Sequence, residues 1–199
     1  DSNKCINSEN VLIFRHLCLL RYGVETSYLN SFIACIADLY SKEVLKKSKT
    51  INVDQMKKIL CDTLTIDNFI TYNNGNLSNV FLSKNINKKF LDSITIKEEY
   101  FESNFYKNID KSNIDHMNLY KKIINAYENF KYYLKSNEYL IDYTYLWDII
   151  CKPNKLLFPN GINLIILDMT SYDVTDNVKV ICPKQSYSNE FIDPEKECL

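Results

Sequence analysis

Apolar side chains recur every three or four residues along much of this chain, which is the spacing of helices that bury one face. The clearest case begins after Asn30, where Phe32, Ile36 and Tyr40 fall on one side. Helices are predicted over residues 31–40 (extending as far as 45), 53–64, 119–134 and 143–151, with another near 96–105. The predicted N-caps of three of these helices are Asn30 or Ser31, Asp54 and Asp142.

The period changes toward the end of the chain. Residues 163–167 (NLIIL) predict a strand buried on both faces, and residues 178–182 predict a second strand that Pro183 ends. The run 11–20 fits a short buried strand or a helix, and 77–82 fits either element. Asn73–Asn76 predicts a turn, because Asn and Gly tolerate positive φ. Early helices and late strands together predict an α+β fold with helices packed on a small sheet.

We expect one domain over residues 1–199, because this length suits a single hydrophobic core. The 15 tyrosines and 10 phenylalanines argue against a disordered chain. The first residue is Asp1, and the chain stops at Cys198-Leu199 in what reads as the start of a strand. The sequence therefore suggests a piece excised from a longer protein.

Charge and cysteine usage narrow the classes of partner and cofactor. The net charge is −1, and arginine occurs only at positions 15 and 21, so nucleic acid is not an expected partner. The seven cysteines stand at irregular spacings without a CxxC pair, which argues against a metal site and favours reduced core thiols in the cytoplasm. No cofactor is expected. The apolar run 11–20 contains Arg15 and His16 and is too short to span a bilayer, so no membrane partner is expected either.

Ser31 is the most informative position for chemistry. Helix N-termini lower thiol pKa values and offer free amides to an oxyanion, so they suit a nucleophile. The string from Tyr28 to Ala37 resembles the motif of OTU and papain-like cysteine proteases, in which a loop ending in Asn-Cys opens an apolar helix. Asn30 matches the motif Asn and Ser31 stands where that family has its nucleophilic Cys. Tyr28-Leu29 replaces the motif's Asp-Gly.

The resemblance extends to a second segment. Residues 143–150, with Trp147, are similar to the OTU helix that begins with Trp, and 163–167 are similar to the strand after it. The resemblance implies an OTU-like fold, an oxyanion loop at Thr26, Ser27 and Asn30, and a catalytic His on a later strand. No His follows His116, so the resemblance implies a pseudo-protease with an inactive Ser31.

Other interpretations of the same residues stay open. Ser31 can be an ordinary N-cap. It can also be an engineered replacement of a natural Cys, in which case the parent protein is a deubiquitinase-like cysteine protease. Cys35 fits the apolar core of the same helix better than a nucleophile, although pairing with His16 or His116 is not excluded by sequence.

A broader resemblance links three segments to large proteins of nucleocytoplasmic large DNA viruses: residues 14–37, 67–81 and 147–183. It implies a place in the host cytoplasm, a virus factory or the virion. The leading hypothesis is a non-catalytic OTU-like module that contacts ubiquitin or a virion component. The alternatives are an OTU-like deubiquitinase and a piece of a viral transcription or virion structural protein; DNA contact would require folding to gather scattered lysines.

Overall fold

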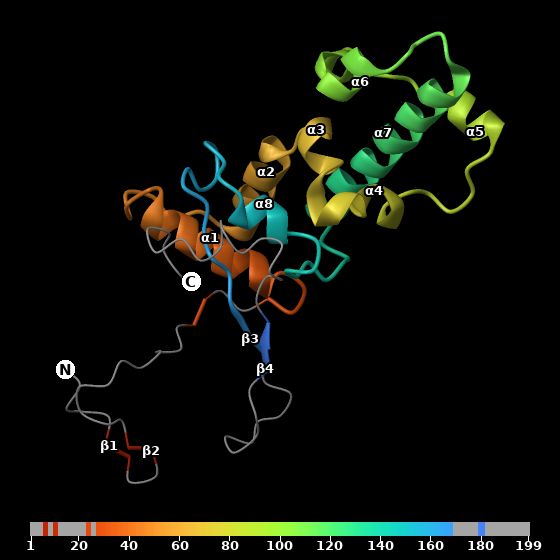
Figure 1. The fold of residues 1–199 in the computed structure, drawn as a ribbon. Helices are drawn as coiled ribbons and strands as arrows, with labels where there is room; N and C mark the ends of the chain where they lie inside the picture. Colours follow the sequence, from red (N-terminus) through yellow and green to blue (C-terminus); the bar gives the residue numbers. More distant parts are fainter. Residues whose placement is uncertain (1–5, 8–9, 12–22, 25–26, 169–178, 182–199) are drawn as a thin grey trace.

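The computed structural model describes residues 6–7, 10–11, 23–24, 27–168 and 179–181. The helices are α1 (Ser31–Glu43), α2 (Val53–Thr63), α3 (Ile66–Phe69), α4 (Leu77–Val80), α5 (Lys88–Ser93), α6 (Asn104–Asn108), α7 (Ile114–Lys135) and α8 (Trp147–Cys151), with 3-10 turns η1 (Tyr72–Gly75) and η2 (Glu98–Glu102). The strands are β1 (Ile6–Asn7), β2 (Asn10–Val11), β3 (Ile166–Asp168) and β4 (Lys179–Ile181). Helices with a small antiparallel sheet confirm the coarse α+β class (Figure 1).

The long helix α7 is the centre of the helical part of the molecule. It packs against α2, α3, α4 and α5, and buries Tyr120, Tyr127 and Phe130 on one face. The helix begins five residues before the predicted start, at Ile114, where Asn113 Oδ1 accepts from the Asp115 amide at 2.9 Å. Hydrophobic periodicity missed this first turn because its residues are mostly exposed, whereas the cap fixes where the helix begins.

Helices α1 and α2 lie side by side and match their predicted spans closely. The cap of α2 is Asn52, so the prediction of Asp54 was wrong. Asn52 Oδ1 accepts from the Gln55 amide at 2.9 Å, and Gln55 Oε1 accepts from the Asn52 amide at 3.1 Å. This reciprocal capping box satisfies two end groups at once, and Asp54 sits in the first turn, where its charge suits the helix dipole.

Two predicted helices are shorter than expected because a polar side chain bonds the backbone locally. The segment 96–105 is divided at Ser103, whose Oγ accepts from the Tyr106 amide at 3.2 Å and starts α6. The segment 143–151 becomes helical only at Trp147. Asp142 Oδ1 accepts from the Thr144 amide at 2.8 Å, which forms a turn and not a helix cap.

The predicted turn at Asn73–Asn76 is confirmed. Asn73, Asn74 and Gly75 have φ values of 51°, 55° and 81°. A buried carboxylate anchors this turn from a distant helix: Asp148 Oδ2 in α8 accepts from the Asn73 amide at 2.5 Å. Burial and the charge of Asp148 raise the pKa of the adjoining Tyr72 to about 12.

The late strands form an antiparallel hairpin with Leu167 opposite Val180 and Ile166 opposite Ile181. The prediction of a strand buried on both faces was wrong. Ile166 packs against the core, but Leu167 is 50 % exposed and Val180 is 57 % exposed, because a hairpin with the core on one side leaves its other face outward. Of the early run 11–20, Val11 lies in β2, which pairs with β1, and the rest lies outside the described residues.

Candidate functional site

Ser31 lies at the end of a tight turn that leads into α1. Its Oγ donates a hydrogen bond to the Ser27 carbonyl, and Ser27 Oγ accepts from the Asn30 amide at 3.2 Å. Ser31 is the first helical residue, so the structure does not use its hydroxyl as the predicted cap. Ser27 therefore closes the turn, and the Ser31 hydroxyl is engaged with backbone.

Asn30 occupies the cap position, but its side chain accepts from no amide of the first turn. The residue is 8 % exposed, and its Oδ1 has no hydrogen-bond partner among the described residues. No acidic side chain lies in the first turn of α1. The helix end keeps its partial positive charge, which is the electrostatic property that an oxyanion site needs.

The imidazoles considered at the sequence level do not complete a site at Ser31. His116 is exposed in the first turn of α7, where its amide donates to Asn113 Oδ1 at 3.4 Å. Figure 1 places the start of α7 and the whole of α1 at opposite ends of the helical part. His16 and the loop residue Thr26 lie outside the described residues.

Cys35 follows Ser31 by one helical turn and was expected in the core, but it is exposed. Partial desolvation and the charge of Asp38 raise the pKa of its thiol. The thiolate is the reactive form, so these surroundings disfavour Cys35 as a nucleophile. Cys61 and Cys151 are buried, as the sequence predicts for core cysteines.

The segment before α8 supports the Ser31 turn. The Ile141 amide donates to the Leu29 carbonyl at 3.0 Å. The rings of Phe32 and Tyr143 meet edge to face at 6.3 Å, and Tyr143 meets Trp147 in the same way at 6.0 Å. The structure thus brings together the two segments on which the OTU resemblance depends.

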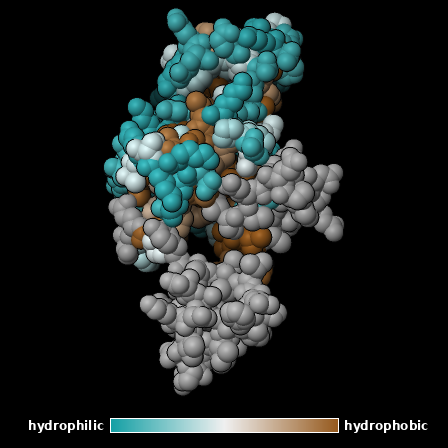
Figure 2. Space-filling view, turned by 90° about the vertical axis from the view of Figure 1, so that its left-hand side faces the viewer, coloured by the Kyte–Doolittle hydropathy of each residue, from teal (hydrophilic) through white to brown (hydrophobic). Residues whose placement is uncertain are grey.

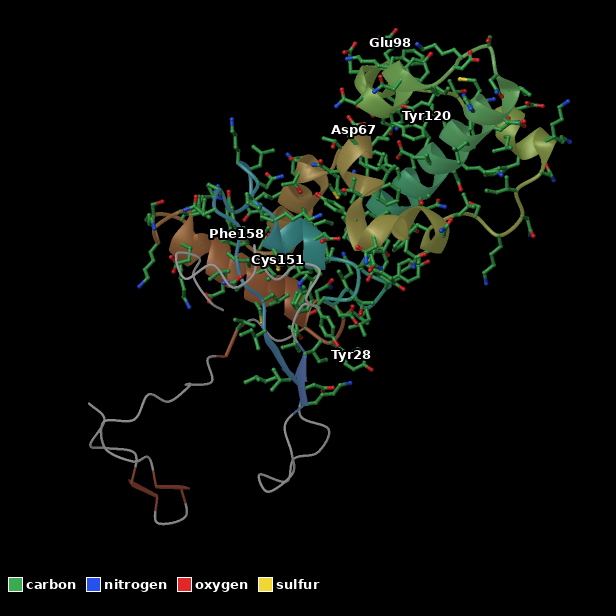
Figure 3. The ribbon with its side chains drawn as sticks, viewed as in Figure 1. Tyr28, Asp67, Glu98, Tyr120, Cys151 and Phe158 are labelled. Atoms are coloured by element: carbon green, nitrogen blue, oxygen red, sulfur yellow. The ribbon has the colours of Figure 1, made fainter. Side chains whose placement is uncertain are left out.

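Tyr28, within the turn, is 93 % exposed and extends away from the ribbon (Figure 3). A nearly fully exposed tyrosine gains nothing from the core, so its ring is available to a partner surface. In the sequence, Tyr28 stands out only as a departure from the OTU motif.

Asp148 and Lys57 are buried charged residues that sequence reasoning did not single out. Asp148 is 4 % exposed, with Lys152 Nζ 3.6 Å from its Oδ1. Lys57 Nζ donates to the Ser136 carbonyl and to Asn137 Oδ1, both at 2.7 Å. Asp148 stands alone among apolar residues in α8, and a lone charge of that kind is the signal that could have found it.

The described part of the chain holds no cluster of three or more His, Cys, Asp or Glu side chains suited to a metal ion. Within the same residues, no helix is long and apolar enough to cross a bilayer. Comparisons with protein-family models, with curated proteins and with solved structures gave no match.

Proposed function

We propose that this chain is a non-catalytic, OTU-like module that binds other proteins. The observation that carries the proposal is the state of Ser31, whose hydroxyl donates to the Ser27 carbonyl. A serine needs an adjacent base to become a nucleophile. The described imidazole, His116, lies in the first turn of α7, at the opposite end of the helical part from α1.

Exposed apolar side chains support a binding role. Tyr28 lies in the turn before Ser31, and Leu167 and Val180 form a cross-strand pair on the open face of the hairpin. Figure 2, viewed from the left-hand side of Figure 1, shows brown, hydrophobic surface at the lower end of the described residues. Exposed aromatic and aliphatic groups of this kind act as anchors in protein interfaces.

The family resemblance supports ubiquitin or a virion component as the partner. With the viral resemblance, it also supports the host cytoplasm, a virus factory or the virion as the place of action. Ubiquitin is the sharper hypothesis, since it can be tested directly with purified protein.

The proposal predicts no hydrolysis of a fluorogenic ubiquitin substrate by the wild type or by Ser31→Cys. The structure gives a thiol at position 31 no described base, so the substitution is expected to add nothing. Ser48→Cys, at an exposed position after α1, controls for a new thiol elsewhere. Turnover by the wild type would overturn the non-catalytic role, and turnover gained only by Ser31→Cys would identify an inactivated deubiquitinase.

Ubiquitin binding is measured separately, by NMR titration of the labelled chain. We expect shifts at Tyr28 and a loss of affinity of about tenfold in Tyr28→Ala, as for an aromatic anchor. Tyr132→Ala removes another exposed ring, in α7, and is expected to bind as the wild type does. Equal affinities for the two variants would exclude Tyr28 as the anchor, and no shifts at all would exclude ubiquitin.

A further inference from the structure

A groove with a volume of about 380 Å³ opens between the end of α2, the start of α3 and η2, with α7 behind it. Apolar and aromatic side chains, including Leu64, Ile66 and Tyr127, form its inner surface. Figure 3 labels the lining residue Asp67 at the start of α3, and Glu98 in η2, which precedes the lining residue Glu99.

The rim of the groove carries an excess of negative charge. Among the residues that line the groove, Lys131 carries the single ammonium. The carboxylates in the lining are those of Asp62, Asp67, Glu99 and Glu102. Asp67 accepts from the amides of α6, and Glu102 pairs with Lys107 at 2.9 Å. Asp62 and Glu99 form no ion pair among the described residues, and both are exposed.

The chain's own lysines show what chemistry this groove accepts. Lys131 Nζ lies 5.2 Å from the centroid of the Tyr127 ring, and Lys97 Nζ lies 5.5 Å from that of Tyr100. Both rings line the groove. An ammonium group over an aromatic ring is stabilised by the ring quadrupole, and nearby carboxylates add to this attraction.

We infer that the groove binds a lysine or arginine side chain from an extended segment of a partner protein. The aliphatic stem would cover Leu64 and Ile66, and the charged group would face Asp62 and Glu99. Long cationic side chains bind in this way, with the stem on apolar surface and the head among polar groups. The inference rests on the proposed protein-binding function and names a surface separate from the Ser31 turn.

The test uses a fluorescein-labelled octapeptide of alternating lysine and glycine, with a glutamine-for-lysine peptide as control. We expect only the lysine peptide to bind and to shift NMR signals of groove residues. Its affinity should fall as salt is added, because salt screens the attraction between the charges. Asp62→Asn and Glu99→Gln are each expected to lower its affinity about two- to fivefold, the value of one exposed ion pair. Lys131→Gln is expected to raise the affinity, because it removes a competing charge.

Glu138→Gln removes an exposed carboxylate after α7 and serves as the matched control. If Asp62→Asn and Glu99→Gln weaken binding no more than Glu138→Gln does, the groove is not the site. Equal binding of the lysine and glutamine peptides would also overturn the inference, yet leave the non-catalytic module standing. Turnover of the ubiquitin substrate would instead overturn the non-catalytic role and leave lysine binding by the groove standing. The two failures are therefore distinguishable.

Discussion

Single buried charges hold distant parts of this fold together. Asp148 joins α8 to the turn at Asn73, and Lys57 joins α2 to the end of α7. A buried charge without partners is costly. The two hydrogen bonds of Lys57, and the Asn73 hydrogen bond and Lys152 ammonium of Asp148, offset this cost.

Asp148→Ala is expected to lower the free energy of unfolding by about 2–4 kcal/mol, since it removes a buried charged acceptor and leaves the Asn73 amide without its partner. Asp148→Asn keeps an oxygen for that amide, and we expect a loss of about 1 kcal/mol. Urea denaturation measures both. Asp92→Ala, at an exposed position in α5, is the control. A loss for Asp148→Ala as small as that of the control would show that the turn does not depend on this carboxylate.

Glu128 gives the fold a dependence on acid pH. Its carboxylate accepts from the Tyr100 hydroxyl and from Lys97 Nζ at 2.6 Å. Burial alone would raise the pKa of Glu128, but these hydrogen bonds outweigh it and lower the pKa. Between the lowered folded value and the ordinary value of about 4.3, the unfolded chain binds more protons. The stabilisation is therefore complete above that ordinary value and is lost as pH falls through the folded pKa.

Glu128→Gln is expected to cost about 0.5–1 kcal/mol at neutral pH, because the pair is partly exposed and screened. The difference from the wild type should shrink as pH falls below the ordinary carboxyl value of about 4.3, and should disappear below the lowered folded pKa, where Glu128 is neutral in both states. Denaturation series at several pH values measure this. A difference that is independent of pH would contradict the assignment.

Several helices in this chain begin at polar side chains that bond the backbone. Asn52 starts α2, Ser103 starts α6 and Asn113 starts α7. Lys57 acts at the opposite end of α7, where its ammonium binds the Ser136 carbonyl and complements the negative end of the helix dipole. The packing of α2 on α7 is therefore fixed by charge as well as by apolar contact.

Lys57→Met keeps most of the apolar stem and removes the ammonium. We expect a loss of about 1–3 kcal/mol, because a carbonyl at the end of α7 loses its donor. Burial lowers the pKa of Lys57, so relief of that cost offsets part of the loss. Lys58→Met, at the exposed neighbouring position, should change stability by less than about 0.5 kcal/mol. Equal losses, or unchanged amide exchange at residues 132–136, would argue against the link.

On the scale of the whole molecule, the two surfaces proposed for binding, one polar and one apolar, lie on different elements. Tyr28 and the Leu167–Val180 pair are at the α1 turn and the hairpin, whereas the acidic groove is formed by α2, α3 and η2. The core that connects them runs from α1 to Leu164. A partner could therefore meet either surface without disturbing the other.

The sequence by itself determined the α+β class and the approximate places of α1, α2 and α7, since helical periodicity is a local property of the chain. It also identified the turn at Asn73–Asn76, because positive φ is favoured by particular residue types. Exact helix ends were less predictable, because several polar residues near each end can act as the cap, as Asn52 and Asp54 show.

Only the tertiary structure decided which side chains meet. Sequence singled out Ser31, but not that its hydroxyl binds Ser27 or that Cys35 is exposed. The bond from Lys57 to Ser136 and the bond from Asp148 to Asn73 join residues far apart in sequence, as do the walls of the acidic groove. Local pattern reports which face of an element is apolar, whereas packing of distant elements determines burial, charge surroundings and the shape of a site.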